Sequence, residues 1–240
     1  MAEHFHLSDF AYAHRGLWTK GGLTENSLEA CLAAASEGLG IEFDVRPSRD
    51  GIPLIFHDPD LARMTFETGR FEDEPANVLK GRPLRGGGAI ISLQDLLEQW
   101  PQETPLLCEL KIDGRTDPEA FAHVVGQQLL SFNGPCAGMS FSRRAVAALP
   151  SGLMRGQLIA PSAETGQANL AETPTVRVDY LACHVTDAHE ETLQAARETL
   201  PLITWTVRSE AESLALQGLT DAQIFEGFDP ALAKRHISNR

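Results

Sequence analysis

The sequence predicts a TIM (β/α)8 barrel that forms a single domain over residues 1–240, with a small hairpin-containing insertion at about residues 46–90. Three observations predict this fold class. Short apolar runs alternate with longer helical patterns along almost the whole chain, which is typical of a parallel sheet with crossover helices. Eight of the nine predicted strands can be joined by such crossovers. The length of 240 residues suits a barrel that is one domain.

Short apolar runs rich in strand-forming residues predict the strands. In chain order these runs are Phe10–Ala13, Ile41–Val45, Pro53–Phe56, Leu106–Leu110, Cys136–Phe141, Gly156–Ala160, Tyr180–Cys183, Leu202–Val207 and Gln223–Phe225. Longer patterns at helical spacing predict helices at Ser27–Glu37, Ser92–Trp100, Pro118–Leu130, Ser142–Ala148, Thr186–Thr199 and Ser209–Gln217. Several of the helices begin at a residue that can cap a helix N-terminus, namely Ser27, Ser92, Asp117, Asp187 and Ser209.

The third predicted strand requires a different connection. Only seven residues separate Val45 from Pro53, whereas a parallel crossover needs about a dozen or more. Asp50-Gly51 is a turn signal, so residues 41–45 and 53–56 are predicted to form an antiparallel hairpin after the second strand. The following stretch, from Asp58 to about Ala89, is loop-like and too long for an ordinary connection. We expect it to be a lid or cap.

Composition excludes several classes of partner. The chain carries 20 Lys and Arg against 33 Asp and Glu, a net charge of -13, which argues against nucleic acid and against stable association with an anionic membrane. A metal ion can still make a single pocket attractive to a small anion. The four cysteines form no C-x-x-C pair and lie in or beside apolar runs, so we expect reduced core thiols. The N-terminus does not resemble a signal peptide, and we expect a cytoplasmic protein. The sequence leaves homo-oligomerisation open.

Three acidic residues are predicted to converge at the barrel mouth, where functional groups of this fold lie. Glu42 and Asp44 stand two apart on one strand and therefore share a face. Glu109 adds a carboxylate from the next parallel strand. Oxygen ligands of this kind suit Mg²⁺ or Ca²⁺. The alternative is a buried salt-bridge network in which Glu42 and Asp44 pair with neighbouring cations, namely Arg46, Arg15 or Lys111.

Two histidines are predicted at the same mouth. His14 follows the first strand and His57 follows the hairpin arm. They could act as acid and base in a displacement at phosphorus, although a lone histidine is more often structural. Arg15 and Lys111 could grip a phosphoryl group. Trp205 could either pack between barrel and helices or form a flat wall at the mouth.

Several short motifs carry a family resemblance: Ala13-His14-Arg15-Gly16, Glu25-Asn26-Ser27, Glu42-Phe43-Asp44-Val45, Phe56-His57-Asp58, Glu109-Leu110-Lys111, Ser140-Phe141 and Trp205-Thr206-Val207. In this order and approximate spacing they closely resemble the glycerophosphodiester phosphodiesterase family, and the likeness covers almost the whole chain.

The resemblance implies a TIM barrel with an insertion after the second strand. It also implies that Glu42, Asp44 and Glu109 bind one divalent cation, Mg²⁺ or Ca²⁺. It implies that His14 and His57 are the catalytic pair, that Arg15 and Lys111 contact phosphate, and that Trp205 shapes the substrate pocket. One departure stands out: the family commonly ends its last strand with Thr-Asp-x-Pro, whereas this chain has Phe225-Glu226-Gly227-Phe228-Asp229-Pro230. Glu226 is a candidate for the acidic role.

The resulting hypothesis is a metal-dependent phosphodiesterase that hydrolyses glycerophosphodiesters to glycerol 3-phosphate and an alcohol by acid–base catalysis of the two histidines. We assign His57 as the acid and His14 as the base, while the sequence leaves the reverse order open, as it does a cyclic phosphate intermediate. One alternative keeps the chemistry but acts on lysophospholipids, as a lysophospholipase D does. It would need an apolar channel, for which Phe66, Phe71 and Phe228 are candidates. Another alternative is a non-catalytic sensor of glycerophosphodiesters. The retained histidines and carboxylates argue against a sensor.

Overall fold

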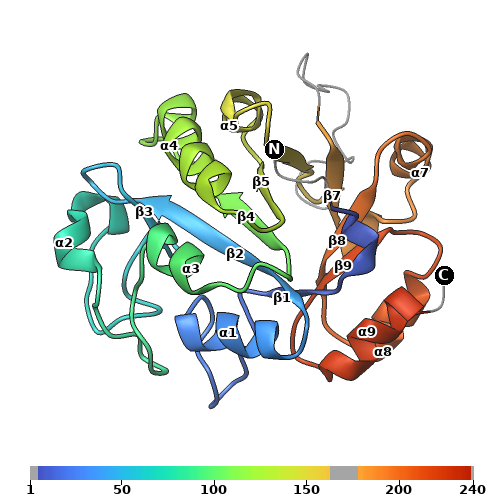
Figure 1. Cartoon of the computed structure of the whole chain (residues 1–240), viewed down its shortest axis with the longest axis horizontal. Helices are drawn as coiled ribbons and strands as arrows, with labels where there is room; N and C mark the ends of the chain where they lie inside the picture. The colour runs from blue at the N-terminus through green and yellow to red at the C-terminus, as the bar shows by residue number, and fades with distance from the viewer. Residues whose placement is uncertain (1–4, 163–177, 239–240) are drawn as a thin grey trace.

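The computed structural model describes residues 5–162 and 178–238 and shows a closed barrel with helices outside it (Figure 1). Its parallel strands are β1 Tyr12–His14, β2 Gly40–Pro47, β4 Leu106–Leu110, β5 Cys136–Ser140, β6 Met154–Leu158, β7 Tyr180–His184, β8 Leu202–Val207 and β9 Ala222–Phe225. They pair in the order β1-β9-β8-β7-β6-β5-β4-β2, and the pairing of β1 with β2 closes the ring. The predicted TIM barrel is therefore confirmed.

Helices cover the outer face of the barrel: α1 Leu28–Ser36, α3 Leu93–Gln99, α4 Pro118–Ser131, α5 Arg143–Ala148, α7 Glu191–Arg197, α8 Glu210–Ala215 and α9 Pro230–Ser238. Four of the predicted N-caps are confirmed because their side chains accept hydrogen bonds from the first turn, namely Ser27, Ser92, Asp117 and Ser209. Ser92 also shares a capping box with Asp95, which fixes where α3 begins beside β3.

The alternation of side chains along the strands creates two apolar layers. Ile41, Phe43 and Val45 of β2 belong to the large core between strands and helices, so the intervening Glu42 and Asp44 face the barrel interior. That interior is filled by a smaller cluster that includes Tyr12, Leu107, Met139, Leu158, Tyr180, Ile203 and Ile224. The acidic side chains thus lie on the inner face of β2, beyond the apolar filling of the barrel.

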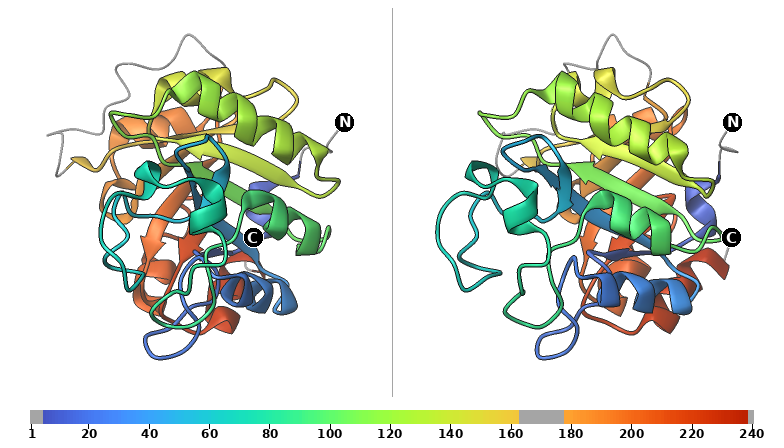
Figure 2. Two further views of the ribbon diagram at one scale, coloured as in Figure 1. Left: turned by 90° about the vertical axis from the view of Figure 1, so that its left-hand side faces the viewer. Right: turned by 60° about the vertical axis from the view of Figure 1, so that its left-hand side comes forward.

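The strand β3, Pro53–Ile55, pairs antiparallel with β2, and Val45 lies opposite Ile55. The hairpin predicted from the short connection is thus present, with Gly51 at φ 79° in its turn. The chain from 56 to 90 then folds at the carboxyl end of β2 (Figure 2). It has its own apolar core, formed by Leu54, Phe56, Leu61, Phe71, Leu79, Leu84 and Ile90. Its function as a lid or cap stays a prediction.

Several boundaries differ from the prediction. The helix expected at Thr186–Thr199 is a 3-10 turn, Val185–Asp187, followed by α7, because the buried Asp187 side chain binds the backbone and hydroxyl of Ser162 instead of capping α7. The strand β6 begins two residues earlier than predicted, since Met154 pairs with Ala137 of β5. Within the described residues, four elements were not predicted: the 3-10 turns Leu7–Asp9 and Phe71–Asp73, α2 at Ala76–Leu79, and α9.

The four cysteines are free and buried, as predicted. None of the helices in the described part of the chain combines the length and apolar character that a membrane-spanning segment needs.

Candidate active site

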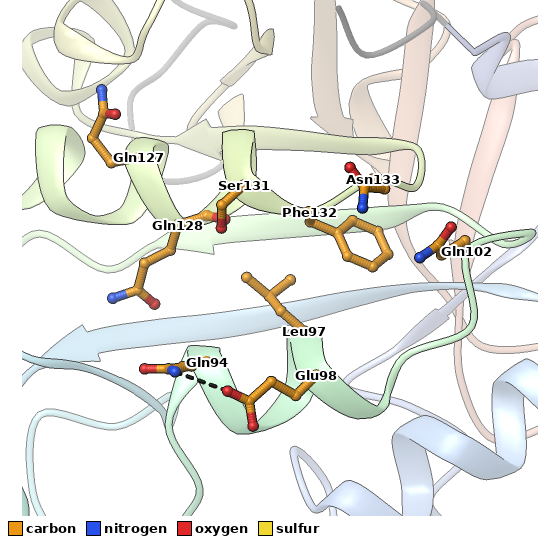
Figure 3. A pocket seen from close by; sticks show the side chains of 9 residues that line it. All are labelled: Gln94, Leu97, Glu98, Gln102, Gln127, Gln128, Ser131, Phe132 and Asn133. Carbon is orange, nitrogen blue, oxygen red and sulfur yellow. Dashed lines mark hydrogen bonds between the residues drawn. The ribbon is translucent and has the colours of Figure 1, made fainter.

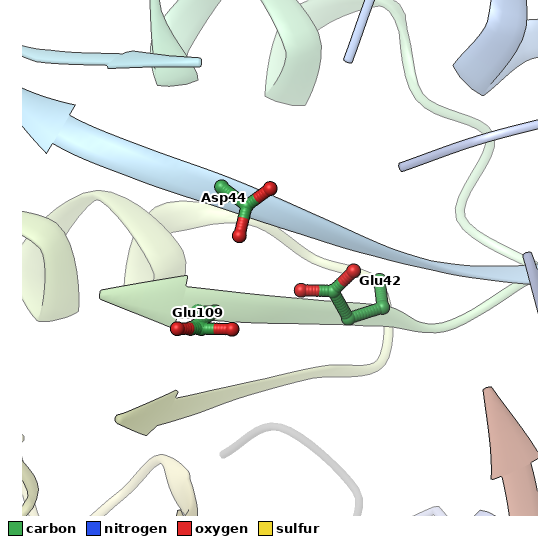
Figure 4. A group of neighbouring side chains, drawn as sticks. All are labelled: Glu42, Asp44 and Glu109. Carbon is green, nitrogen blue, oxygen red and sulfur yellow. The ribbon is translucent and has the colours of Figure 1, made fainter. Parts of the chain in front are cut away.

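Three carboxylates meet inside the barrel near the carboxyl ends of its strands. Glu42 and Asp44 come from β2 and Glu109 from β4 (Figure 4). Register places Asp44 directly beside Glu109, and one oxygen of each of the three groups lies within 4.8 Å of the others. All three residues are buried. The convergence predicted from their two-residue spacing is therefore present.

Two cations neutralise part of this cluster. The Lys111 Nζ lies 2.9 Å from Asp44 Oδ1 and 2.6 Å from Glu109 Oε1, and Arg15 Nε lies 3.1 Å from Asp44 Oδ2. Although burial by itself would raise the pKa of Asp44, Lys111 and Arg15 lower it. The salt-bridge alternative considered from sequence is thus realised for Asp44. Arg46 does not take part, because it pairs with Glu72 and Asp113 instead.

Of the three carboxylates, Glu42 has the fewest contacts, within the described part of the chain, with cations or hydrogen-bond donors that would offset the cost of burying its charge. Its Oε2 is buried without a hydrogen-bond donor among the described residues. Burial first, and then repulsion from Asp44 and Glu109, raise the pKa of Glu42 well above its ordinary value. An unsatisfied buried carboxylate oxygen facing two further carboxylates is costly unless a cation is bound. The donor set, three hard oxygens in one pocket, therefore fits a divalent cation such as Mg²⁺ or Ca²⁺.

His14 is hydrogen-bonded through one ring nitrogen, and the other faces the acidic cluster. Its Nδ1 lies 2.5 Å from Glu226 Oε2, at the end of β9, and its Nε2 lies 3.8 Å from Glu42 Oε2. Burial lowers the pKa of His14, while the hydrogen bond with Glu226 opposes that shift. The other Glu226 oxygen accepts from Arg208 Nε at 2.8 Å. Glu226, which departs from the family pattern in the sequence, is thus a direct partner of His14.

His57 follows β3 and is 32% exposed. Its Nδ1 lies 2.7 Å from Asp58 Oδ1, and its backbone carbonyl accepts from Arg46 Nε at 2.8 Å. Both histidines lie close enough to Asp44 for a proton on either ring to lower the pKa of that carboxyl, after the larger effects of Lys111 and Arg15. His57, Glu109 and Lys111 are among the residues that line a cavity of about 200 Å³.

The loop after β1 depends on unusual backbone conformations. Arg15 and Asn26 both have φ 57°, a region that residues other than glycine rarely adopt. The Asn26 amide donates to Asp44 Oδ2 at 2.8 Å, and its backbone N–H donates to the Arg15 carbonyl. Arg15 Nη1 donates to Glu25 Oε1 at 2.8 Å. The strained backbone therefore delivers one cation and one amide to Asp44.

Trp205 lies at the mouth and not between the barrel and the helices. It packs against the cluster that fills the barrel interior. Its ring makes edge contacts with Phe141 and His184, at centroid distances of 5.6 and 5.3 Å. Phe141 is 41% exposed and also lines the 200 Å³ cavity beside His57. Trp205 and Phe141 thus supply an aromatic wall near the carboxylates, the mouth position considered from sequence.

The structure brings together all eight residues singled out from the sequence and adds neighbours without a predicted role. Asn26 and Asp58 belong to the motifs named in the sequence analysis, so those motifs could have indicated their contacts with Asp44 and His57. No such motif indicated a role for Arg63. It lies in the stretch expected to be loop-like, and its ion pairs join residues 5 and 38 positions away.

The cavity of about 470 Å³ between α3 and α4 lies apart from these residues (Figure 3). Its floor contains Leu97 and Phe132, and its rim is amide-rich, with Gln94 donating to Glu98. Its lining residues include neither the three clustered carboxylates nor His14 or His57. Size alone therefore does not locate the chemistry in this molecule.

Comparison with known protein families is consistent with the motifs. A model described as the glycerophosphoryl diester phosphodiesterase family matches residues 14–137, just over half of the chain. The probable glycerophosphodiester phosphodiesterase 2 of Mycobacterium tuberculosis is 37% identical over 97 residues, 40% of this chain and 36% of that protein. The human glycerophosphodiester phosphodiesterase 1 is 42% identical over 64 residues, 26% of this chain and 19% of that protein. The matches thus span about a third or less of these curated relatives.

Solved structures resemble the whole barrel. An Oleispira antarctica phosphodiesterase in complex with the product sn-glycerol-3-phosphate has a TM-score of 0.76 and 25% identity, covering 96% of this chain and 97% of that one. A putative glycerophosphodiester phosphodiesterase from Galdieria sulphuraria has a TM-score of 0.80 and 20% identity, covering 96% and 98%. The second likeness shows the fold alone.

Proposed function

This chain belongs to the glycerophosphoryl diester phosphodiesterase family, and from that premise we propose that it hydrolyses glycerophosphodiesters to glycerol 3-phosphate and an alcohol with the help of a divalent cation. The observation that carries the proposal is the meeting of three buried carboxylates with His14 and His57 at one end of the barrel. The product bound by the Oleispira antarctica structure supports the choice of glycerol 3-phosphate.

Glu42, Asp44 and Glu109 would hold the cation, Mg²⁺ or Ca²⁺. The cation would supply a positive charge that stabilises the phosphoryl oxygens as negative charge develops on them. Arg15 pairs with Asp44, and Lys111 pairs with both Asp44 and Glu109. Their guanidinium and ammonium groups would attract and orient the phosphate of the incoming diester.

The two histidines would move the protons. His14 holds Glu226 through Nδ1, so its Nε2 is the atom placed to accept a proton from the attacking oxygen. If that oxygen belongs to water, the attack gives glycerol 3-phosphate directly. If it belongs to the neighbouring glycerol hydroxyl, the attack gives a cyclic phosphate, which water then opens as His57 takes the proton of the water and His14 returns one to the glycerol oxygen. His57 holds Asp58 through Nδ1, so its Nε2 is placed to donate a proton to the departing alcohol oxygen as the P–O bond breaks. Trp205 would shape the pocket in which the substrate lies.

A second candidate substrate class is favoured by one observation. Phe228 packs on Phe225 and lines a cavity of about 430 Å³ together with Leu17 and Trp18, next to Glu226. Such a surface could receive the acyl chain of a lysophospholipid. The other two candidates for an apolar channel do not contribute. Phe71 is buried against Phe56 at a centroid distance of 4.6 Å, while Phe66 lies exposed beneath Arg85.

A metal-by-substrate panel tests the proposal. The purified chain is incubated with Mg²⁺, Ca²⁺ or a chelator and with glycerophosphodiesters of different headgroups, and release of glycerol 3-phosphate is measured. His14→Ala and His57→Ala should each remove most of the turnover, while His189→Ala, at an exposed position, should not. Preferred cleavage of acylated substrates would favour the second candidate. Tight binding of intact diester without product release would indicate a sensor and contradict an enzyme.

A further inference from the structure

One arginine from the segment between β3 and α3 makes four hydrogen bonds to two carboxylates at the barrel mouth. Arg63 donates to Asp58 from Nε at 2.5 Å and from Nη2 at 2.8 Å. It also donates to Glu25 from Nη1 at 2.8 Å and from Nη2 at 2.7 Å. All three nitrogens of the planar guanidinium therefore donate. The side chain joins the loop after β1 to the residue that follows His57.

Each of the two carboxylates in turn holds a residue that the proposed function places on the substrate. Asp58 Oδ1 lies 2.7 Å from His57 Nδ1. Glu25 Oε1 accepts from Arg15 Nη1 at 2.8 Å, and Arg15 reaches Asp44. A continuous path of contacts runs from His57 through Arg63 to Arg15. Both ends of this path face the acidic cluster.

The backbone around Arg63 is anchored independently of these ion pairs. Thr65 donates its N–H to the Leu61 carbonyl, and Leu61 donates to Gly69. The side chains of Leu61 and Thr65 are buried, and Leu61 belongs to the apolar core of the 56–90 segment. The Arg63 side chain thus extends from an anchored turn. Its hydrogen bonds can therefore hold the two carboxylates in place relative to that turn.

The electrostatics agree with this geometry. Partial burial by itself would raise the pKa of both carboxyls, but hydrogen bonds from His57 and Arg63 lower the pKa of Asp58. Hydrogen bonds and charge from Arg63 and Arg15 likewise lower the pKa of Glu25. Both carboxylates therefore stay charged near neutral pH and remain acceptors for the arginine.

We propose that Arg63 is a positioning residue that fixes the relative position and orientation of the His57 and Arg15 side chains through Asp58 and Glu25. This inference rests on the proposed function. It does not touch the reacting atoms. Its effect is to keep the imidazole that donates the proton aligned with the guanidinium that orients the phosphate. Misplacement of such groups by about 1 Å can cost on the order of 100-fold in rate.

Three variants test the proposal. Arg63→Gln removes the charge and most donors, and Arg63→Lys keeps the charge but cannot span both carboxylates. Arg85→Gln is the matched control, since Arg85 lies in the same segment and is exposed over Phe66. We expect kcat to fall by about 10- to 100-fold in both Arg63 variants, with thermal unfolding temperatures close to that of the control. Values of kcat within twofold of wild type in both would overturn the proposal.

A second readout does not depend on turnover. In ¹⁵N-labelled protein, the ring nitrogen shifts of His57 report the hydrogen bond with Asp58, and those of His184 serve as an internal reference. We expect Arg63→Gln to change the His57 shifts and to leave those of His184 unchanged. Unchanged His57 shifts would overturn the proposal even if kcat falls. If wild type cleaves no diester, the proposed function fails, and these shifts alone decide whether Arg63 positions His57.

Discussion

The His14 imidazole and the Glu226 carboxylate lie 2.5 Å apart although 212 positions separate them in the chain. They meet because β1 and β9 are neighbours in the closed barrel, with Ala13 beside Phe225. The carboxylate also accepts from Arg208. Barrel closure therefore brings the last strand to the histidine of the first motif. The carboxylate binds Nδ1 and thereby orients the ring so that Nε2 faces Glu42.

Glu226→Gln should lower kcat by about 10- to 100-fold while changing KM little, because the amide keeps the shape but weakens the bond that orients His14. Steady-state kinetics on the preferred glycerophosphodiester measure the change. Glu191→Gln, at an exposed position in the first turn of α7, is the control. A Glu226→Gln enzyme with unchanged kcat would show that His14 keeps its orientation without this carboxylate.

Glu42→Gln should stabilise the protein in the presence of chelator and abolish stabilisation by a divalent cation. The raised pKa of Glu42 comes from burial and from repulsion by Asp44 and Glu109. A buried unsatisfied group costs roughly 1–3 kcal/mol, and the neutral amide avoids the charge. Thermal unfolding with chelator, Mg²⁺ or Ca²⁺ measures both effects, with the exposed Glu103→Gln as control.

The same carboxyl predicts a dependence on pH. Because its folded pKa is raised, Glu42 binds more protons in the folded than in the unfolded state above the ordinary Glu pKa. Its contribution to the stability of the metal-free protein therefore falls as pH rises through the folded pKa. Cation binding needs the deprotonated form, so the stabilisation by cation should grow over the same pH range. Equal cation effects at low and neutral pH would contradict this assignment.

Sequence patterns predicted the barrel and its site best where side chain and strand position are locally linked. The two-residue spacing of Glu42 and Asp44 specifies a common face on any strand, and the seven-residue link after Val45 permits only a hairpin. The helix expected at Thr186–Thr199 begins only at Glu191, because Asp187, the expected N-cap, binds Ser162, a partner 25 positions away. Such a competitor has no signal in the local pattern.

The same distinction explains the parts of the site that were not predicted. Arg63 reaches Glu25 only because the 56–90 segment folds around Leu61 and its own apolar core. The pairing of Glu226 with His14 depends on closure of the whole barrel. Neither contact follows from spacing along one element, since each requires the tertiary arrangement of distant segments.

The four thiols should not react with a thiol reagent until the chain unfolds. Burial raises the pKa of Cys31, Cys136 and Cys183 to about 12, and that of Cys108 is raised as well. Near neutral pH the thiolate, which is the reactive form, is therefore scarce, and the side chains are inaccessible. A colorimetric disulfide reagent should detect four thiols in denaturant and almost none in buffer. Rapid labelling of native protein would contradict the packing described above.

Gly16→Ala should destabilise the protein more than Gly21→Ala. Both glycines have φ 83°, so the conformational cost of a side chain, about 1 kcal/mol, is shared. They differ in space: a Cβ at Gly16 would lie 2.6 Å from the backbone carbon of Ala30 in α1, whereas Gly21 has nothing within 4 Å. The clash must displace α1 or the loop carrying Arg15. We therefore expect Gly16→Ala to lose roughly 1–3 kcal/mol more by denaturant unfolding, together with activity. Equal losses in the two variants would mean that the loop after β1 can move away from α1 at no cost.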